Sequence, residues 1–162
     1  MILYIVRHGI AVDRDDPKCP PEAERPLTAE GVKKTRSAAL GMKSMGAKPD
    51  LLITSPLVRA AQTAEIFAEV LGYAPAKIRA TDSLMPAANP TEFIRELTKI
   101  RAKEIACFGH APHLDMLIAQ MAGARGVFTQ IKKAGAACLE QTGGKWELRW
   151  MLAPKVLRQL AE

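Results

Sequence analysis

Near the start of the chain, Arg7 and His8 place an arginine beside a histidine directly after an apolar run. A guanidinium carries a planar set of donors that suits phosphate oxygens, and a neutral imidazole can attack phosphorus as a nucleophile. Gly9 follows, and a glycine permits a backbone turn that a Cβ atom would obstruct. The tripeptide therefore suggests phosphoryl chemistry, although a lone Arg-His-Gly is more often an ordinary loop start.

Two later stretches have the same character and favour a shared site. Arg59 comes shortly after the apolar run 51–53, and Gly109-His110 follows the apolar run 105–108. If each run is a buried strand, three strand ends carry residues that can hold an anion. Ligands of open α/β sheets bind outside the carboxyl ends of the strands. We therefore expect Arg59 and His110 to meet the Arg-His pair in one crevice.

The residues before Arg59 predict how it is positioned. Ser55-Pro56 is typical of an N-cap followed by a proline at the first helical position. Arg59 then falls in the first turn of a helix, where free backbone N–H groups also favour an anion. The alternative is a surface salt bridge with an acid such as Glu65, and the company of the other anion-binding residues speaks against it.

The rest of the chain alternates between predicted strands and helices. Strands are expected at 3–6, 51–54, 77–80, 104–108, 126–131, 134–140 and 145–152, and helices at 28–46, 56–72, 89–100, from 112 onwards and at 154–160. Such alternation predicts an α/β fold with helices on both faces of a mostly parallel sheet. A C-terminal hairpin, turning at Gly143-Gly144, should make the sheet mixed. We expect one three-layer α/β/α domain over residues 1–162.

Composition limits the possible partners and the location. The apolar content of 48% and charged content of 25% are typical of a soluble globular protein. The net charge of +6 comes from scattered basic residues without interleaved aromatics, which argues against nucleic acid and for anionic substrates or acidic partners. No run is long enough for a signal peptide or a bilayer span. With three unpatterned cysteines, we expect a cytoplasmic monomer without a disulfide framework.

Two features could be mistaken for metal sites. The loop after Gly9 contains Asp13, Asp15 and Asp16, but their spacing matches no Ca²⁺ loop and is typical of a solvated turn. His113 lies three residues beyond His110, yet a His-x-x-His pair without a third ligand is weak evidence for a metal. We expect His113 at the rim or the surface, and we predict no metal and no cofactor.

Several motifs together resemble a known family. They are Arg7-His8-Gly9, Arg25-Pro26-Leu27-Thr28 with Gly31, Ser55-Pro56 with Arg59-Ala60 and Gln62-Thr63, and Gly109-His110. In their order and spacing the chain resembles the histidine phosphatase (phosphoglycerate mutase-like) superfamily, and within it the phosphohistidine phosphatases of the SixA type. The resemblance implies that His8 becomes phosphorylated, with Arg7, Arg59 and His110 holding the phosphoryl group. It also implies that Arg25 and Gly9 help to form the substrate pocket.

One position departs from the broad superfamily. Many members carry a carboxylate just after the leucine that corresponds to Leu84, where it serves as the general acid for the leaving group. Met85 occupies that position here, as in the SixA-type enzymes, which also lack the acid. Asp82 is near in sequence and is an alternative proton donor.

The resemblance implies a metal-independent phosphatase that acts through a phosphohistidine intermediate, with protein phosphohistidine as the expected substrate. A phosphatase for small phosphomonoesters, such as sugar phosphates, is the alternative within enzymes. A non-catalytic module that binds phosphate or a phosphoprotein is the alternative from another class, and the retained His8 argues against it. A mutase is disfavoured because the acid position is empty and the insertions that enclose a bisphosphoglycerate are missing.

Overall fold

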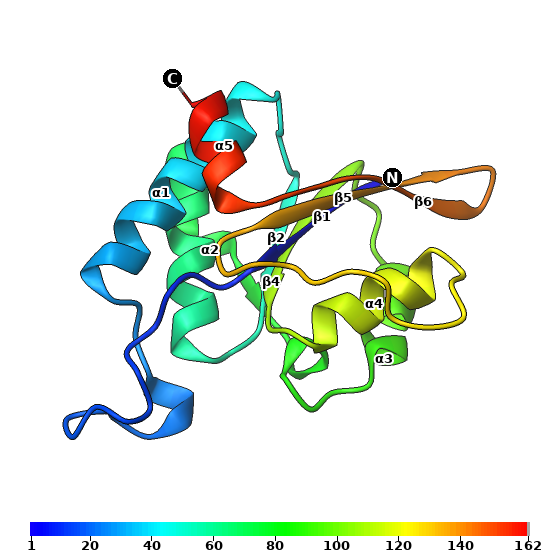
Figure 1. Ribbon diagram of the computed structural model, residues 1–162. Helices are drawn as coiled ribbons and strands as arrows, with labels where there is room; N and C mark the ends of the chain where they lie inside the picture. The colour runs from blue at the N-terminus through cyan, green and yellow to red at the C-terminus, as the bar shows by residue number, and fades with distance from the viewer. Residues whose placement is uncertain (162) are drawn as a thin grey trace.

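A six-stranded sheet forms the centre of the computed structural model, which describes residues 1–161 (Figure 1). The strands are β1 (Ile2–Arg7), β2 (Leu51–Thr54), β3 (Arg79–Ala80), β4 (Glu104–Gly109), β5 (Ala136–Thr142) and β6 (Lys145–Leu152). Their order across the sheet is β3-β2-β4-β1-β5-β6. The first four strands pair in parallel, β5 pairs antiparallel with β1, and β6 pairs antiparallel with β5. The predicted mixed, mostly parallel α/β architecture is therefore confirmed.

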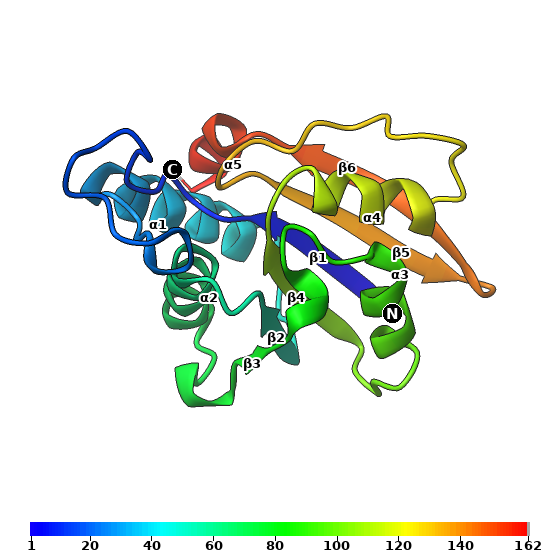
Figure 2. The same cartoon turned by 90° about the horizontal axis from the view of Figure 1, so that it is seen from below.

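Helices cover both faces of this sheet, as Figures 1 and 2 show from two directions. They are α1 (Ala29–Ser44), α2 (Val58–Leu71), α3 (Pro90–Leu97), α4 (His113–Met121) and α5 (Pro154–Leu160), with 3₁₀ turns η1 (Glu22–Glu24), η2 (Pro75–Lys77) and η3 (Asp82–Leu84). On one face, α1 packs against α2 and α5; on the other, α3 packs against α4. None of the helices in residues 1–161 has the length and apolar character needed to cross a membrane.

The central strands are apolar throughout because both of their faces are buried. In β1, Leu3 and Ile5 pack on the side of α3 and α4, whereas Tyr4 and Val6 pack on the side of α1, α2 and α5. Alternate side chains of a strand point to opposite faces, so a doubly covered strand must be apolar at nearly every position. This arrangement fixes the register of the strands whose ends carry the site.

Two glycines inside α1 allow other parts of the backbone to approach the helix. A Cβ atom on Gly41 would collide with the carbonyl group of Leu157 in α5, and one on Gly31 would collide with the carbonyl group of Ile10. A glycine inside a helix costs about 1 kcal/mol relative to alanine. Here that cost accompanies close packing of α5 and of the chain that leaves β1.

The segment between α4 and β5 corrects one prediction. Residues 126–131 were expected to form a strand, but they form an irregular segment. Its backbone finds partners outside the sheet, since the N–H group of Ile131 donates to Asp115 and its carbonyl group accepts from Arg7. The apolar residues that suggested a strand, Val127 and Phe128, are exposed.

The entry to α2 corrects a second prediction. The helix begins at Val58, and Leu57, not Ser55, occupies the N-cap position. The Ser55 hydroxyl instead accepts a hydrogen bond from the Leu57 N–H group at 3.3 Å, which forms a turn before the helix. Arg59 still lies in the first helical turn, as expected. The strand predicted at 77–80 is likewise shorter, because η2 occupies residues 75–77.

Candidate active site

The carboxyl ends of β1, β4 and β2 meet at one edge of the sheet. Arg7 lies opposite Gly109 in the register of β1 and β4. Beyond the strands, the His8 N–H group donates to the Gly109 carbonyl at 3.0 Å, and the Ser55 N–H group donates to the Phe108 carbonyl at 2.9 Å. These bonds hold the three strand ends together, and a cleft of about 930 Å³ opens beside them.

The cleft gathers the charged residues that the sequence singled out. Five cationic side chains line it (Arg7, Arg14, Arg25, Arg59 and Lys133), together with three acidic ones (Asp13, Asp15 and Glu22) and the imidazoles of His8 and His110. Positive side chains exceed negative ones, which favours an anionic ligand. Four predicted catalytic residues and Arg25 therefore lie in one place.

His8 is buried and electrically neutral at pH 7. Its Nδ1 atom lies 2.7 Å from the Gly9 carbonyl oxygen. Because a carbonyl oxygen can only accept, Nδ1 carries the proton and Nε2 keeps its lone pair. Burial, together with the charges of Arg59 and Arg7, lowers the pKa of His8 to about 4, against the opposing effect of the Gly9 carbonyl. The side chain is therefore a neutral base whose Nε2 atom can act as a nucleophile.

His110 presents a different nitrogen. Its Nε2 atom lies 2.9 Å from the Ser55 hydroxyl oxygen. That hydroxyl also accepts from the Leu57 N–H group and has the Met85 sulfur 3.8 Å away as a second possible acceptor of its proton. In the tautomer in which the hydroxyl donates to Nε2, the ring proton resides on Nδ1, which is then a donor. Burial, together with the nearby His8 and Arg59, lowers the pKa of His110 to about 3.

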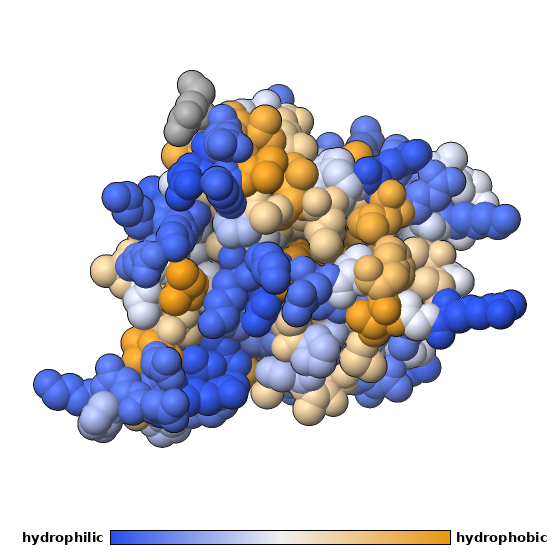
Figure 3. Space-filling view, viewed as in Figure 1, coloured by the Kyte–Doolittle hydropathy of each residue, from blue (hydrophilic) through white to orange (hydrophobic). Residues whose placement is uncertain are grey.

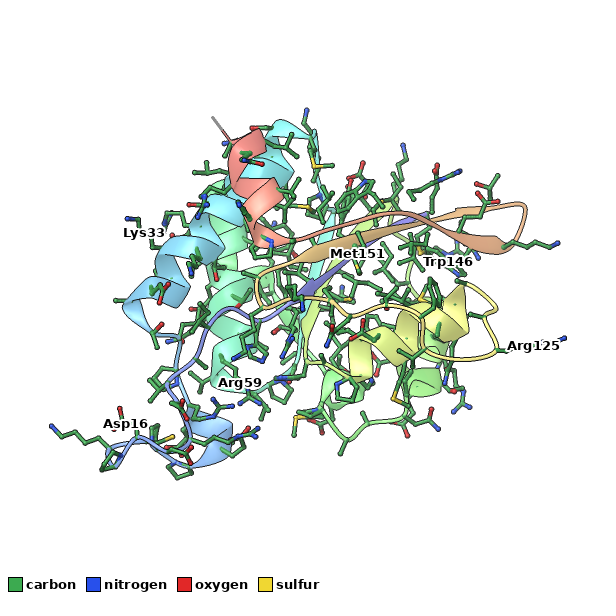
Figure 4. All side chains as sticks on the ribbon, viewed as in Figure 1. Asp16, Lys33, Arg59, Arg125, Trp146 and Met151 are labelled. Carbon is green, nitrogen blue, oxygen red and sulfur yellow. The ribbon has the colours of Figure 1, made fainter. Side chains whose placement is uncertain are left out.

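Arg59 is almost completely buried, with 2% of its surface exposed. Its Nη1 group donates to the Glu22 carbonyl at 2.9 Å, and Nη2 pairs with the Glu22 carboxylate at 3.1 Å. Its partner is thus an acid other than Glu65, and the guanidinium of this pair is buried and not on the surface. Figure 4 shows Arg59 between the start of α2 and the loop that carries Asp16. Burial lowers the pKa of Arg59, but a guanidinium stays charged at neutral pH.

Glu22 connects three arginines of the cleft, and the sequence analysis did not single it out. Its carboxylate pairs with Arg14 at 2.9 Å, with Arg25 at 3.0 Å and with Arg59 at 3.1 Å. Hydrogen bonds from Arg14 and Arg25 hold its pKa at about 2. It lies at the base of the loop 13–24, a hydrophilic projection at the lower left of Figure 3. The only sequence signal was the spacing Glu-x-x-Arg before the Arg-Pro-Leu-Thr motif.

Gly9 lies behind His8 and is not among the lining residues of the cleft. Its N–H group donates to the Thr63 hydroxyl at 3.0 Å, and that hydroxyl donates to the Arg59 carbonyl at 2.7 Å. A Cβ atom on Gly9 would collide with the Thr35 hydroxyl. Close packing, and not the turn that the sequence suggested, therefore requires glycine here, and Thr63 ties the His8 loop to α2.

The model of the histidine phosphatase superfamily (branch 1) matches residues 3–85. The chain belongs to the histidine phosphatase superfamily. An uncharacterized protein from Picosynechococcus sp. is 36% identical over 140 residues, which cover 83% of this chain and 82% of that protein. His8 lies within the matched residues and lines the cleft.

Solved structures have the same fold. The protein histidine phosphatase SixA complexed with tungstate has a TM-score of 0.85 and 22% identity, over 97% of this chain and 99% of that one. The α-ribazole phosphatase from Shigella flexneri has a TM-score of 0.78 and 16% identity, over 95% of this chain and 97% of that one. The two share the phosphatase name but differ in the substrates that their names state.

His113 and Asp82 do not lie where the sequence analysis placed them or where a proton donor would have to lie. His113 was predicted at the rim, but it begins α4 with 1% of its surface exposed. Its ring nitrogens have no hydrogen-bond partner of good geometry within residues 1–161, although the Ser83 backbone opposes the lowering of its pKa by burial. Asp82 is exposed in η3 and is not among the residues that line the cleft. Met85 has its sulfur 3.8 Å from the Ser55 hydroxyl.

Three buried side-chain nitrogen atoms of the cleft residues have no partner within residues 1–161: Arg7 Nε, Arg59 Nε and His110 Nδ1. Buried polar groups are nearly always hydrogen-bonded, so an unpartnered set around one cleft points to a ligand that accepts these bonds. Among the described residues, no group of three or more His, Cys, Asp and Glu has an arrangement that could hold a metal ion.

Proposed function

We propose that this phosphatase hydrolyses protein phosphohistidine through a phosphorylated His8. The observation that carries the proposal is the set of unpartnered donors on Arg7, Arg59 and His110 around a neutral His8. A phosphoryl group accepts several charge-assisted hydrogen bonds at once, and such donors are strongest in a buried site.

In the proposed reaction, the free Nε2 atom of His8 attacks phosphorus while the bond from phosphorus to the leaving group breaks. The phosphoryl group is then bound to His8 Nε2; a water oxygen attacks this phosphorus, the bond from Nε2 to phosphorus breaks, and inorganic phosphate leaves a neutral imidazole. Arg7, Arg59 and His110 stabilise the charge on the transferring oxygens, and Arg25 completes the wall of the cleft.

The expected leaving group follows from the carboxylates near the cleft. Glu22 is held ionised by its arginines, Asp82 does not line the cleft, and the usual acid position is Met85. An alkoxide leaves poorly without a proton from a general acid. A phosphohistidine ring can be protonated from solvent and depart as neutral imidazole, so it does not require an acid from the protein.

A phosphatase for small phosphomonoesters is the second candidate. Two observations favour it: the similarity in fold to an α-ribazole phosphatase, and the presence of Asp13 and Asp15 along the cleft as carboxylates that could donate a proton. A non-catalytic binding module is the third alternative. It predicts that no phosphoenzyme forms.

The test compares kcat/KM for a phosphohistidine peptide, p-nitrophenyl phosphate and a sugar phosphate, together with acid-free trapping of a labelled phosphoenzyme. We expect phosphohistidine to be cleaved best, the activated aryl ester poorly and the sugar phosphate least. The label should appear in the wild type and be missing from His8→Ala. A sugar phosphate that proves best would replace phosphohistidine with the second candidate, and an unlabelled wild type would support the binding module.

A further inference from the structure

Asp115 is a buried carboxylate outside the cleft. It lies in the first turn of α4 with 4% of its surface exposed, and it does not line the cleft. Its Oδ1 atom accepts two hydrogen bonds, from the Thr129 hydroxyl at 2.7 Å and from the Ile131 N–H group at 2.9 Å. Both donors belong to the irregular segment between α4 and β5, so one oxygen atom anchors that segment to the helix.

The anchored segment in turn holds Arg7. The Ile131 carbonyl accepts from Arg7 Nη1 at 3.0 Å, and the N–H group of Ala134 approaches the carbonyls of Arg7 and His8, each at 3.1 Å. With Nη1 occupied by the backbone, the guanidinium has a fixed orientation in which Nε lacks a protein partner. The orientation of Arg7 therefore depends on where the Ile131 carbonyl lies.

The first part of this segment has few attachments of its own. Val127 and Phe128 are more than half exposed, whereas Ile131 and Ala134 are buried, and residues 122–135 contribute no strand to the sheet. Figure 4 shows Arg125, near the start of the segment, projecting away from the molecule. Buried side chains and the bonds of Ala134 hold the end of the segment, and the two hydrogen bonds to Asp115 attach its middle to α4.

We infer that Asp115 is a positioning residue for phosphate binding: by holding Thr129 and Ile131, it fixes the carbonyl that orients the Arg7 guanidinium. The inference rests on the proposed function, in which Arg7 binds the phosphoryl group. Orientation set before binding removes an entropic cost, and a misplacement of about 1 Å can reduce a rate roughly 100-fold. The negative charge of Asp115 also opposes the lowering of the pKa of Arg7 by burial.

The experiment measures the dissociation constant of tungstate by calorimetry, which requires no turnover, and kcat/KM in parallel. Asp115→Ala should weaken tungstate binding roughly 10- to 100-fold. Asp115→Asn should stay within about threefold of the wild type, because its amide oxygen can accept the same two bonds. Thr129→Val, which removes one bond, should give a smaller loss and serves if Asp115→Ala does not fold.

Asp50 provides a matched control at the other end of the sheet. Its Oδ2 atom also accepts two backbone hydrogen bonds, from Lys103 at 2.9 Å and from Glu104 at 3.0 Å. Asp50→Ala should lower the melting temperature but leave tungstate affinity and kcat/KM within about twofold, since this residue lies away from the cleft. A purely structural role for Asp115 would give the same pattern.

A double-mutant cycle decides whether the effect passes through Arg7. In an Arg7→Ala background, Asp115→Ala should cause no further loss of tungstate affinity. Unchanged affinity in both Asp115→Ala and Thr129→Val, or an equal loss with and without Arg7, would overturn the inference. Dependence of tungstate binding on Asp115 in a protein that leaves phosphohistidine uncleaved would refute the proposed substrate while supporting the positioning role.

Discussion

The imidazole rings of His8 and His110 lie with their centroids 5.1 Å apart and their planes tilted by 53°. They come from opposite halves of the chain and meet because β1 and β4 are neighbours in the sheet. Burial disfavours the charged form of each ring, and two imidazolium ions at this separation would also repel each other. The pair is therefore most stable when both rings are neutral.

The first prediction concerns pH. Burial lowers the pKa of His8 to about 4 and that of His110 to about 3, whereas an unfolded histidine has a pKa of about 6.5. Between these values the unfolded chain binds more protons, so the free energy of unfolding should rise with pH up to about 6.5 and then level off. NMR titration of the imidazole resonances, assigned with histidine variants, measures the pKa values. Titration of His8 near 6.5 would contradict its neutral, buried state.

The second prediction concerns the nucleophile. His8→Ala should abolish turnover of every phosphorylated substrate, because no other imidazole in the cleft has a free Nε2 atom: that of His110 is bound to Ser55. The circular dichroism spectrum should remain that of the wild type. Turnover in His8→Ala near the wild-type rate would refute the proposed mechanism.

The third prediction compares two arginines. Arg59→Ala should cost about 2.7–4 kcal/mol of transition-state stabilisation, the range typical of one preorganised donor to a developing oxyanion. Arg36→Ala is the matched control, since its ion pair with Glu69 at 2.7 Å lies on the exposed surface. Surface pairs are worth about 0–1 kcal/mol, so kcat/KM of Arg36→Ala should be unchanged. Equal losses in the two variants would mean that general charge, and not the site, is responsible.

The fourth prediction concerns the empty acid position. Met85→Glu should raise turnover of an alkyl phosphate more than turnover of phosphohistidine, because general acid catalysis typically contributes ~10²–10⁴-fold. Met85→Gln has a similar shape but no proton to donate, and it should leave the ratio of the two kcat/KM values unchanged. If Met85→Glu and Met85→Gln gave the same ratio of kcat/KM for alkyl phosphate to kcat/KM for phosphohistidine, the prediction would fail. Either the carboxyl group would then not reach the leaving oxygen, or another acid would already protonate it.

The fifth prediction concerns metals. The cationic side chains of the cleft can stabilise a phosphoryl group without an ion, so kcat/KM should survive treatment with EDTA. Tungstate should inhibit competitively by occupying the same donors. Loss of activity on chelation, followed by recovery with Mg²⁺ or Zn²⁺, would show that part of the positive charge comes from a metal ion.

Much of the site could be predicted because its residues follow apolar runs. Arg7, Arg59 and His110 each come at or just beyond a strand end, and parallel strands bring their carboxyl ends to one edge. Two predicted helix caps are confirmed: Thr28 and Asn89 cap α1 and α3, since their side chains need only local partners. The cap predicted at Ser55 was wrong, because α2 begins after Leu57.

The sequence by itself determined that Arg7, Arg59 and His110 gather at one edge of the sheet, because each follows an apolar run and parallel strands bring their carboxyl ends to the same edge. Only the tertiary structure decided the order of the strands and how those side chains are held. Glu22 pairs with three arginines, and Asp115 reaches Arg7 through Ile131. These contacts join segments that are far apart or irregular, and the burial of His113 likewise depends on the packing around it. Residues 126–131 illustrate the reason: their composition suggested a strand, but their hydrogen bonds go to a carboxylate and a guanidinium, partners that no local pattern specifies.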